Sequence, residues 1–412
     1  MSRQRSLKLA LTLIAVVLAL VLASGGLFVA RGADPIKIGF GMALTGGLSA
    51  NGKPALLALQ IWKDDVNKKG GLLGRQVELI FYDDQTNPAT IPGIYSKLLD
   101  VDKVDLIISG YGTNLIAPLL PIAMERKLTL IGMFGLANNE KYQYPNYFQI
   151  QPAGPDPQTS TAIGFFELAA KQNPKPQTVA LVGARELVKK FGFKTVYDKT
   201  YPPNTTDYTP IVRAIKATNA DIVFVASYPP DSVGMLRAAH EVGLQPKMFG
   251  GGMVGLMFTS IMTSMGPMLN GVVNYDFWAP EPPMLAFAGI KEFLKEYQAR
   301  AEKEKMDPLG YYLPPYSYAV GQVLGQAVEA VKSLDQQKIA DHIRATEFNT
   351  VVGKIKFGKN GEWAKGRTLM VQYQKIQGNG IEQFRGAGTK PVLWPDELKS
   401  GNIIYPYASA LK

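Results

Sequence analysis

The sequence predicts an α/β protein whose parallel strands are divided between two lobes. Short apolar runs, which suit buried parallel strands, alternate with amphipathic helical stretches along most of the chain. The chain has 412 residues, more than one hydrophobic core usually organises, so two domains are expected. A proline-rich stretch at residues 151–157 separates two such alternating series, and we interpret it as a crossing between the lobes.

The chain opens on a strand, a glycine-rich turn, a helix and a second strand. Residues 36–42 form an apolar run that is typical of a buried parallel strand, residues 54–68 have a helical pattern, and residues 77–84 form the next strand. In proteins with parallel α/β sheets, ligands bind at the loops that join the carboxyl ends of strands to the following helices. We therefore expect residues 44–51 to lie beside a ligand.

The same alternation continues through the rest of the chain. Further strands are predicted at residues 105–109, 128–132, 178–182, 221–226, 248–250, 271–274, 354–357 and 368–373. Further helices are predicted at residues 91–101, 115–127, 158–171, 210–218, 232–243, 287–303 and 315–333. Additional crossings are expected at residues 276–282 and 351–356, and residues 391–412 are expected to wrap a lobe as an irregular tail.

Residues 1–33 are predicted to be an export signal. Arg3, Arg5 and Lys8 precede an apolar run at residues 9–30 that contains no charge. We expect the mature protein to start between residues 26 and 34 and to be soluble in the periplasm, which N-terminal sequencing would show. The run is also long enough to span a bilayer, so an uncleaved anchor stays open; an intact Met1 in the membrane fraction would support it.

Composition excludes several classes of function. The formal charge is +10, but the basic residues are scattered among acids, which indicates a solvated surface and no nucleic-acid partner. The sequence has no cysteine and only two histidines, so it predicts no disulfide framework, histidine metal cluster or Ser-His triad. We expect no cofactor and no metal.

Motifs that would indicate an enzyme are incomplete. Gly39 and Gly41 follow a strand, but Leu44 stands where a dinucleotide fingerprint needs its third glycine. The glycines at residues 250–252 lack the Lys-Ser/Thr of a phosphate loop. Asp83 and Asp84 are neighbours whose side chains diverge, so we expect them to hold loops. The sequence predicts no catalysis.

Several spaced motifs, in order between residues 36 and 384, resemble one family. They are Ile38-Gly39-Phe40, Ala43-Leu44-Thr45-Gly46, Asn67-Lys68-Lys69-Gly70-Gly71-Leu72-Leu73-Gly74, Tyr82-Asp83-Asp84, the segment at residues 200–208, and Ala220-Asp221-Ile222-Val223. They look like the type I periplasmic binding proteins of the branched-chain amino acid and amide ABC-transporter group. The resemblance implies two Rossmann-like lobes joined by three hinge crossovers.

The resemblance also implies domain limits and a mechanism. Residues 34–152 with 279–353 would form the N-terminal lobe, and residues 153–278 with 354–390 the C-terminal lobe. A small ligand would be captured between the lobes by hinge closure. It would then be delivered to the permease subunits of an ABC transporter, with no stable membrane insertion after signal cleavage.

In this family the loop after the third strand holds the ligand carboxylate, and here Thr113 retains the hydroxyl for it. Members of the family that bind amino acids hold the ligand ammonium with a threonine and an acidic side chain. The matching positions here are Leu136 and Gly252, which supply no partner. An unpaired ammonium in a dry cleft costs several kcal/mol, a large part of the roughly 8 kcal/mol of a micromolar complex.

The cleft-facing loops are rich in aromatic and apolar residues, which favours a carboxylate on an apolar, aromatic body. The resemblance and this composition together predict the ligand contacts Leu44, Thr45, Tyr111, Gly112, Thr113, Asn114, Phe134, Gly135, Leu136, Tyr228, Met253, Phe277 and Trp278. Further aromatic candidates are Phe40, Tyr311 and Tyr312.

Two alternatives stay open. Branched-chain amino acid or amide binding would need a rearranged partner for the ammonium, and a binding module of the same fold could instead feed a sensor. The loop after Gly183 is shorter than relatives usually have, so the second lobe could lack one ligand-contacting loop.

Overall fold

The structure is a computed structural model that describes residues 34–182, 185–202 and 205–411. The chain divides into two units, Met1–Pro35 and Ile36–Lys412, and the described helices and strands all lie in the second unit. The predicted export signal at residues 1–33 lies outside the described residues. Among the helices that are described, none combines the length and the apolar character needed to cross a bilayer.

The first lobe is built on a five-stranded sheet with the order β2-β1-β3-β4-β5. All of its neighbouring strands are parallel, as predicted. The strands are β1 (Ile36–Met42), β2 (Val77–Asp83), β3 (Leu106–Tyr111), β4 (Leu130–Met133) and β5 (Tyr147–Gln149). Their carboxyl ends place the loops that begin at Ala43, Gly112 and Phe134 along one edge of the sheet.

The helices of this lobe come from both halves of the chain. They are α2 (Ser49–Lys68), α3 (Ile91–Asp100), α4 (Thr113–Ile116), α5 (Leu120–Glu125), α6 (Asn138–Tyr142), α13 (Ile290–Glu304), α14 (Pro314–Val331) and α15 (Gln336–Ala345). Helix α14 packs against α2 so closely that a Cβ on Gly321 would lie 2.2 Å from the Trp62 ring.

Two helix predictions differ from the structure at proline positions. Helix α2 begins at Ser49, before the predicted start at Pro54, so Pro54 lies inside the helix, in its second turn, where it omits one backbone hydrogen bond. The helix predicted at residues 115–127 is divided into α4, a 3₁₀ turn and α5. Pro118 and Pro121 begin these later turns, since proline cannot continue the hydrogen-bond ladder of a preceding helix.

The second lobe is built on a seven-stranded sheet with the order β14-β13-β10-β9-β8-β6-β7. Its strands are β6 (Thr178–Val182), β7 (Lys194–Asp198), β8 (Ile222–Ser227), β9 (Met248–Met253), β10 (Val273–Asp276), β13 (Leu369–Gln372) and β14 (Val392–Trp394). The strands from β6 to β10 are parallel, whereas β13 and β14 are antiparallel to their neighbours.

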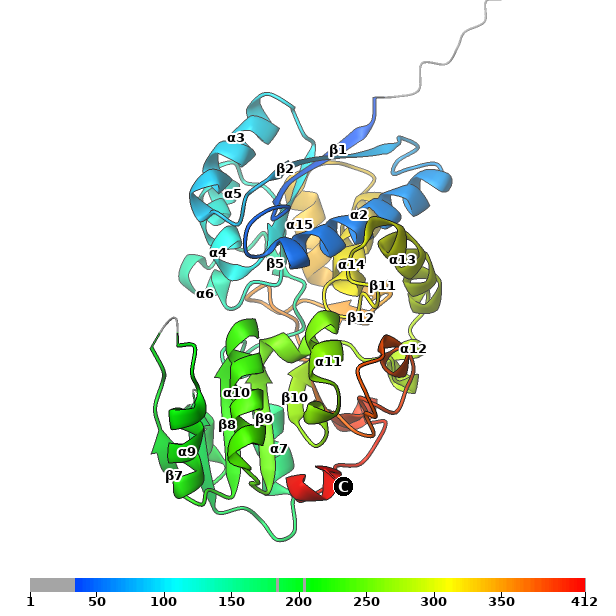
Figure 1. Ribbon diagram of the computed structural model, residues 1–412. Helices are drawn as coiled ribbons and strands as arrows, with labels where there is room; N and C mark the ends of the chain where they lie inside the picture. The colour runs from blue at the N-terminus through cyan, green and yellow to red at the C-terminus, as the bar shows by residue number, and fades with distance from the viewer. Residues whose placement is uncertain (1–33, 183–184, 203–204, 412) are drawn as a thin grey trace, which may run out of the picture. The chain divides into compact units, whose positions relative to one another are not determined.

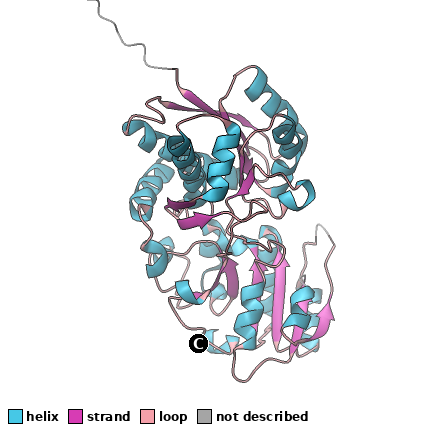
Figure 2. Ribbon diagram, turned by 180° about the vertical axis from the view of Figure 1, so that it is seen from behind, coloured by secondary structure: helices cyan, strands magenta, loops and turns pink. Residues whose placement is uncertain are grey.

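The helices of the second lobe are α7 (Ile163–Ala170), α8 (Glu186–Lys190), α9 (Thr209–Ala217), α10 (Pro229–Val242), α11 (Thr259–Met265) and α12 (Pro282–Leu285). Helices stand in front of the strands in both of the opposite views, so both faces of the sheets are covered (Figures 1 and 2). Such cover suits the unbroken burial of strands such as β9 and β10.

The C-terminal residues are more regular than predicted. The expected irregular tail contains β14, which extends the second sheet beside β13. Farther along, the Tyr407 N–H donates to the Lys247 carbonyl at 2.9 Å, and the Tyr407 ring lies 5.6 Å from the Phe249 ring. This segment therefore completes the second lobe rather than merely wrapping it.

Three connections join the lobes, but the third lies later than expected. Residues 351–356 lie within the hairpin of β11 (Glu347–Thr350) and β12 (Gly353–Lys356), which contacts α14 of the first lobe. The connection to β13 follows Lys356. It runs beside the first crossing, where the Gln149 N–H donates to the Gly361 carbonyl and the Arg367 N–H donates to the Pro152 carbonyl, each at 2.8 Å.

Candidate ligand-binding cleft

The loop between β3 and α4 presents a hydroxyl that is free to donate. Thr113 is exposed at the start of α4, and its Oγ1 accepts the Leu136 N–H at 2.9 Å. Asn138 Nδ2 donates to the Thr113 carbonyl at 3.0 Å and steadies the turn. A hydroxyl can accept and donate at once, and among the described residues Thr113 Oγ1 serves only as an acceptor, so its proton can be donated to an anionic ligand.

Two glycines of these loops, Gly112 and Gly135, stand where other residues fit poorly, the first because of its backbone conformation and the second because of close contacts. Gly112, before Thr113, has a φ of 104°, a conformation that favours glycine. A Cβ on Gly135 would lie 2.3 Å from Asn138 Oδ1. Phe134, Gly135 and Leu136 thus form a tight turn over Thr113, in which Leu136 remains 39% exposed.

Asp83 holds the loop between β1 and α2. Its carboxylate accepts the N–H groups of Leu44 and Thr45 and, at 2.6 Å, the Thr45 hydroxyl. Burial acts to raise the pKa of Asp83, but these hydrogen bonds and that from Gln85 lower it. The neighbouring Asp84 accepts the Thr86 N–H, so both acids hold loops, as predicted. Thr45 remains a predicted contact, with its hydroxyl directed to Asp83.

An aromatic cluster lies where the two lobes meet, formed by Tyr111, Phe134, Phe258, Phe277, Tyr312 and Tyr316. The Phe134 ring lies 4.9 Å from Phe277, 5.1 Å from Tyr316 and 5.6 Å from Tyr312. Phe258 of the second lobe lies 5.3 Å from Tyr312. These edge-to-face and tilted arrangements are favourable for aromatic pairs. Phe134, Phe277, Tyr312 and Tyr316 are each buried, so the cluster forms an apolar, aromatic layer where the lobes meet.

Two tyrosine hydroxyls in this cluster are hydrogen-bonded to each other. The Tyr111 and Tyr312 oxygens lie 2.9 Å apart. Burial, with a smaller contribution from nearby Tyr228, raises the pKa of Tyr111. Tyr228 itself is 75% exposed, just before α10 of the second lobe. Tyr111 and Tyr228, which belong to opposite lobes, both stay predicted contacts.

Other predicted contacts are deeper in the protein. Met253 is buried at the end of β9, and its N–H donates to Asn274 Oδ1 at 2.9 Å. Trp278 is fully buried and packs 4.8 Å from the Tyr311 ring. Trp278 and Tyr311 thus form the packing of the second crossing, whereas Phe277 joins the aromatic cluster.

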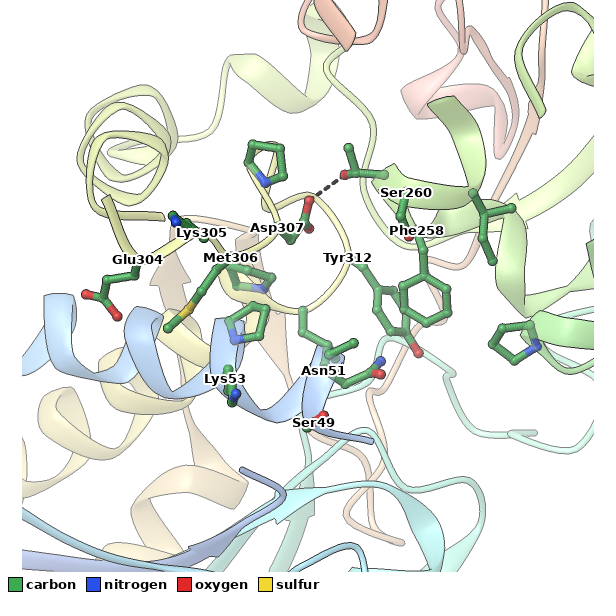
Figure 3. A pocket seen from close by; sticks show the side chains of 18 of the residues that line it. Ser49, Asn51, Lys53, Phe258, Ser260, Glu304, Lys305, Met306, Asp307 and Tyr312 are labelled. Carbon is green, nitrogen blue, oxygen red and sulfur yellow. Dashed lines mark hydrogen bonds between the residues drawn. The ribbon is translucent and has the colours of Figure 1, made fainter. Parts of the chain in front are cut away.

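A groove of about 1160 Å³ lies between the start of α2 in the first lobe and residues 258–263 of the second. Predicted contact Leu44 lines it. Cluster member Tyr312 lines it as well (Figure 3). The Thr259 hydroxyl donates to Asp307 at 2.5 Å across it, the bond drawn in Figure 3. Burial raises the pKa of Asp307. Asn51 belongs to the segment predicted to lie beside a ligand, whereas the contribution of residues 304–308 was not foreseen, because the α13–α14 loop is far away in sequence.

The second crossing is anchored by a buried ion pair. Lys390 Nζ lies 2.6 Å from Asp276 Oδ2, and the two side chains are 4% and 2% exposed. The other oxygen of Asp276 accepts the N–H groups of Phe277 and Trp278. Asp276 was predicted to lie in a crossing. Nothing in the sequence indicated that its partner would be Lys390, which follows the third crossing along the chain.

The prediction of a short loop after Gly183 falls on residues 183–184, which lie outside the described residues, as do residues 203–204 of a matched motif. In the ranges that are described, no group of three or more acidic, histidine or cysteine side chains could hold a metal ion.

Comparison with known proteins then decides the family. The family model described as "Periplasmic binding protein" matches residues 35–378. The chain belongs to the periplasmic binding protein family. This confirms the two-lobed α/β fold with parallel sheets, and it makes the chain a binding protein rather than an enzyme.

The relatives of this periplasmic binding protein differ in what they are said to bind. The chain is 24% identical to Leu/Ile/Val-binding protein homolog 8 of Brucella abortus, over 85% of this chain and 91% of the relative. It is 18% identical to the branched-chain amino acid transporter substrate binding protein LivJ from Streptococcus pneumoniae, solved with isoleucine, at a TM-score of 0.67, covering 90% and 100% of the two chains.

A third comparison is with a solute binding protein of an ABC transporter from Rhodopseudomonas palustris in complex with 3,4-dihydroxy benzoic acid. The identity is 20% and the TM-score 0.67, over 84% of this chain and 94% of the other. At these identities the two solved structures support the fold alone.

Proposed function

We propose that this periplasmic binding protein captures a small apolar carboxylate, of the aromatic-acid class, and delivers it to the permease of an ABC importer. The observation that carries the proposal is the combination at one cleft of the free Thr113 hydroxyl with the aromatic cluster around Phe134. Thr113 suits the carboxylate, and the rings suit an aromatic body.

The charged side chains near the cleft favour a ligand that is an acid without an ammonium group. Leu136 and Gly252, at the positions of the family's ammonium partners, carry no acceptor side chain. The buried carboxylate of Asp276 is neutralised by Lys390. Asp307 already accepts from the Thr259 hydroxyl and from two backbone N–H groups. A zwitterion would therefore enter with its cation unpaired, which is costly in a closed cleft.

The competing ligand class is branched-chain amino acids, which the names of the Brucella relatives favour. A thermal-shift screen of amino acids, amides and aromatic acids separates the two, since a ligand raises stability according to its concentration and affinity. Calorimetry with benzoate, cinnamate, leucine and valine then gives affinities. We expect leucine to bind at least about tenfold more weakly than the best aromatic acid. Tight leucine binding with no response to aromatic acids would overturn the assignment.

Thr113→Ala is expected to weaken carboxylate binding by about 1–3 kcal/mol, through loss of a charge-assisted hydrogen bond. Calorimetry with the best-bound acid measures the change. Thr218→Ala is a matched control, because its hydroxyl donates to the Ile215 carbonyl at the end of α9 and is unrelated to the cleft. Unchanged affinity in Thr113→Ala would show that the carboxylate is held elsewhere.

Ligand binding is expected to close the cleft by rotation about the three crossings. Small-angle X-ray scattering should then give a smaller radius of gyration at a saturating concentration of a confirmed ligand. An unchanged radius with such a ligand would count against hinge closure. A sensor role would be favoured if the closed form bound a receptor domain in place of a permease.

A further inference from the structure

The groove beside the start of α2 has the properties of a binding subsite. We propose that it takes the far end of the captured ligand, and that this end carries an oxygen acceptor for Asn51 Nδ2. The inference rests on the proposed function, because it assumes that the near end of the ligand is the carboxylate at Thr113. It extends the ligand class from simple aromatic acids to elongated ones with a second polar end.

Asn51 is the residue that points to a ligand. Its side chain is 6% exposed and lines the groove. Within the described part of the chain, its Nδ2 atom has no hydrogen-bond partner. Figure 3 shows the amide extending from α2 toward Tyr312. A buried amide donor without a partner is unfavourable, so an acceptor supplied by a ligand would be stabilised there.

The local electrostatics also favour an acceptor. Helix α2 is 20 residues long, its first turn has no acidic residue, and Leu48 provides no side-chain cap. The partial positive charge of the helix start is thus unopposed. Lys53 adds an exposed ammonium to the same wall.

Two acids line the groove as well. Asp307 is already satisfied by Thr259 and by the N–H groups of Leu309 and Gly310. Glu304 lies at the end of the groove away from Tyr312 (Figure 3).

The groove borders the predicted carboxylate loop. Tyr312 lines the groove, and its hydroxyl bonds to that of Tyr111, two residues before Thr113. Leu48, at the start of α2, lies 3.7 Å from the position of a Cβ on Gly112. One ligand could therefore reach both Thr113 and Asn51 by passing Tyr312.

The dimensions and walls suit an elongated apolar body. At about 1160 Å³, the groove is somewhat larger than the pockets that hold drug-sized molecules, which measure about 300–1,000 Å³. A benzoate-sized ligand would leave much of it empty. Its apolar walls are formed by Leu44, Leu56, Phe258, Ile261, Met306 and Leu313.

Calorimetry on the full mature chain tests the subsite with ligands that differ only at the far end. Cinnamate, 4-carboxycinnamate, 4-carbamoylcinnamate and 4-ethylcinnamate form one series, and norleucine with 2-aminoadipate forms a second. We expect the acceptor-ended cinnamates to bind wild type at least about tenfold more tightly than 4-ethylcinnamate. Asn51→Leu, which has a similar shape and no donor, should abolish this preference and leave cinnamate affinity within about threefold.

Further variants separate the contributions. Asn51→Asp, which keeps the shape but replaces the donor by an acceptor, should remove the preference for 4-carboxycinnamate if Asn51→Leu folds poorly. It does not test 4-carbamoylcinnamate, whose own N–H groups can donate to the new carboxylate. Lys53→Met should weaken 4-carboxycinnamate but not 4-carbamoylcinnamate. Thr218→Ala, at the end of α9 and outside the groove, is the control and should retain the preference.

The outcomes distinguish the two proposals. If norleucine or 2-aminoadipate binds and no cinnamate does, the proposed function is overturned. The subsite would still be supported in that case if wild type bound 2-aminoadipate more tightly than norleucine and Asn51→Leu did not. The subsite would be overturned if wild type bound the acceptor-ended and the apolar-ended ligands of a series with equal affinity. It would also be overturned if the preference for the acceptor-ended ligands survived in Asn51→Leu. Binding of none of these compounds would overturn both proposals.

Discussion

Lys390→Met is expected to lower the free energy of unfolding by about 3–5 kcal/mol, because it leaves the buried Asp276 carboxylate without its counter-charge. Asp276 and Lys390 are each almost completely buried, with 2.6 Å between Nζ and Oδ2. Methionine retains most of the apolar stem of lysine and removes the ammonium. The Asp276 carboxylate then keeps its two backbone donors, Phe277 and Trp278, but loses its counter-charge.

Urea unfolding of wild type and variant measures this loss. The double variant Asp276→Asn with Lys390→Met should recover most of it, because neither buried charge remains. Lys354→Met is the matched control, since its exposed pair with Glu347 should contribute no more than about 1 kcal/mol. A cost for Lys390→Met as small as that of the control would show that the pair is solvated in solution.

Glu362→Gln is expected to stabilise the protein at pH 9 by about 3–5 kcal/mol and to have little effect at pH 4. Glu362 lies in the third crossing, 2% exposed. Neither carboxyl oxygen has a hydrogen-bond partner in the described ranges. Burial, reinforced by the charge of Glu140, raises the pKa of Glu362 from its usual 4.5 to about 8.

The direction follows from the proton that the folded state retains. Below pH 4.5 both states are protonated, so Glu362 costs no ionisation energy. Between pH 4.5 and about 8 the unfolded chain releases its proton first, and the free energy of unfolding falls as pH rises. Glutamine stays neutral and removes this contribution.

Urea unfolding of wild type and Glu362→Gln at pH 4, 7 and 9 measures the effect. The difference between the two proteins isolates Glu362 from Asp84, whose burial raises its pKa to about 6 and gives wild type a slope of the same sign. Glu347→Gln, at an exposed acid paired with Lys354, serves as the control, because Glu347 does not contribute to the raised pKa of Glu362. A constant difference across pH would mean that Glu362 is ionised normally in the folded protein.

Most of the fold could be predicted because the relevant signals are local. Strand β6 was predicted at its observed limits, since Thr178–Val182 is a continuous apolar run that suits a strand buried on both faces. The role of Asp83 and Asp84 was also predictable, because acids at a strand end commonly accept N–H groups of the following turn.

The missed elements depend on distant partners. Strand β7 has exposed ends at Lys194 and Asp198 and little apolar content, so only its pairing with β6 defines it. Strand β14 is three residues long and exists because β13 provides its hydrogen bonds. Neither segment carries enough periodicity to be recognised alone.

The site divides in the same way. The turn around Thr113 was predictable from its motif, and the structure adds that Leu136 and Asn138 orient it. The ligand contacts predicted at this turn and across the cleft stay predictions. Asn51 was included only as the end of a ligand-facing loop, since nothing in the local sequence indicates that its amide lacks a partner.

Residue types and short spacings were enough to predict the alternation of strands and helices and the position of the loop that carries Thr113. Three features could be found only in the folded chain: Lys390 neutralises Asp276, Tyr312 meets Tyr111, and Asn51 faces a groove lined by Thr259 and Asp307. These contacts join residues tens to hundreds of positions apart, which become neighbours only when the chain crosses between lobes and packs.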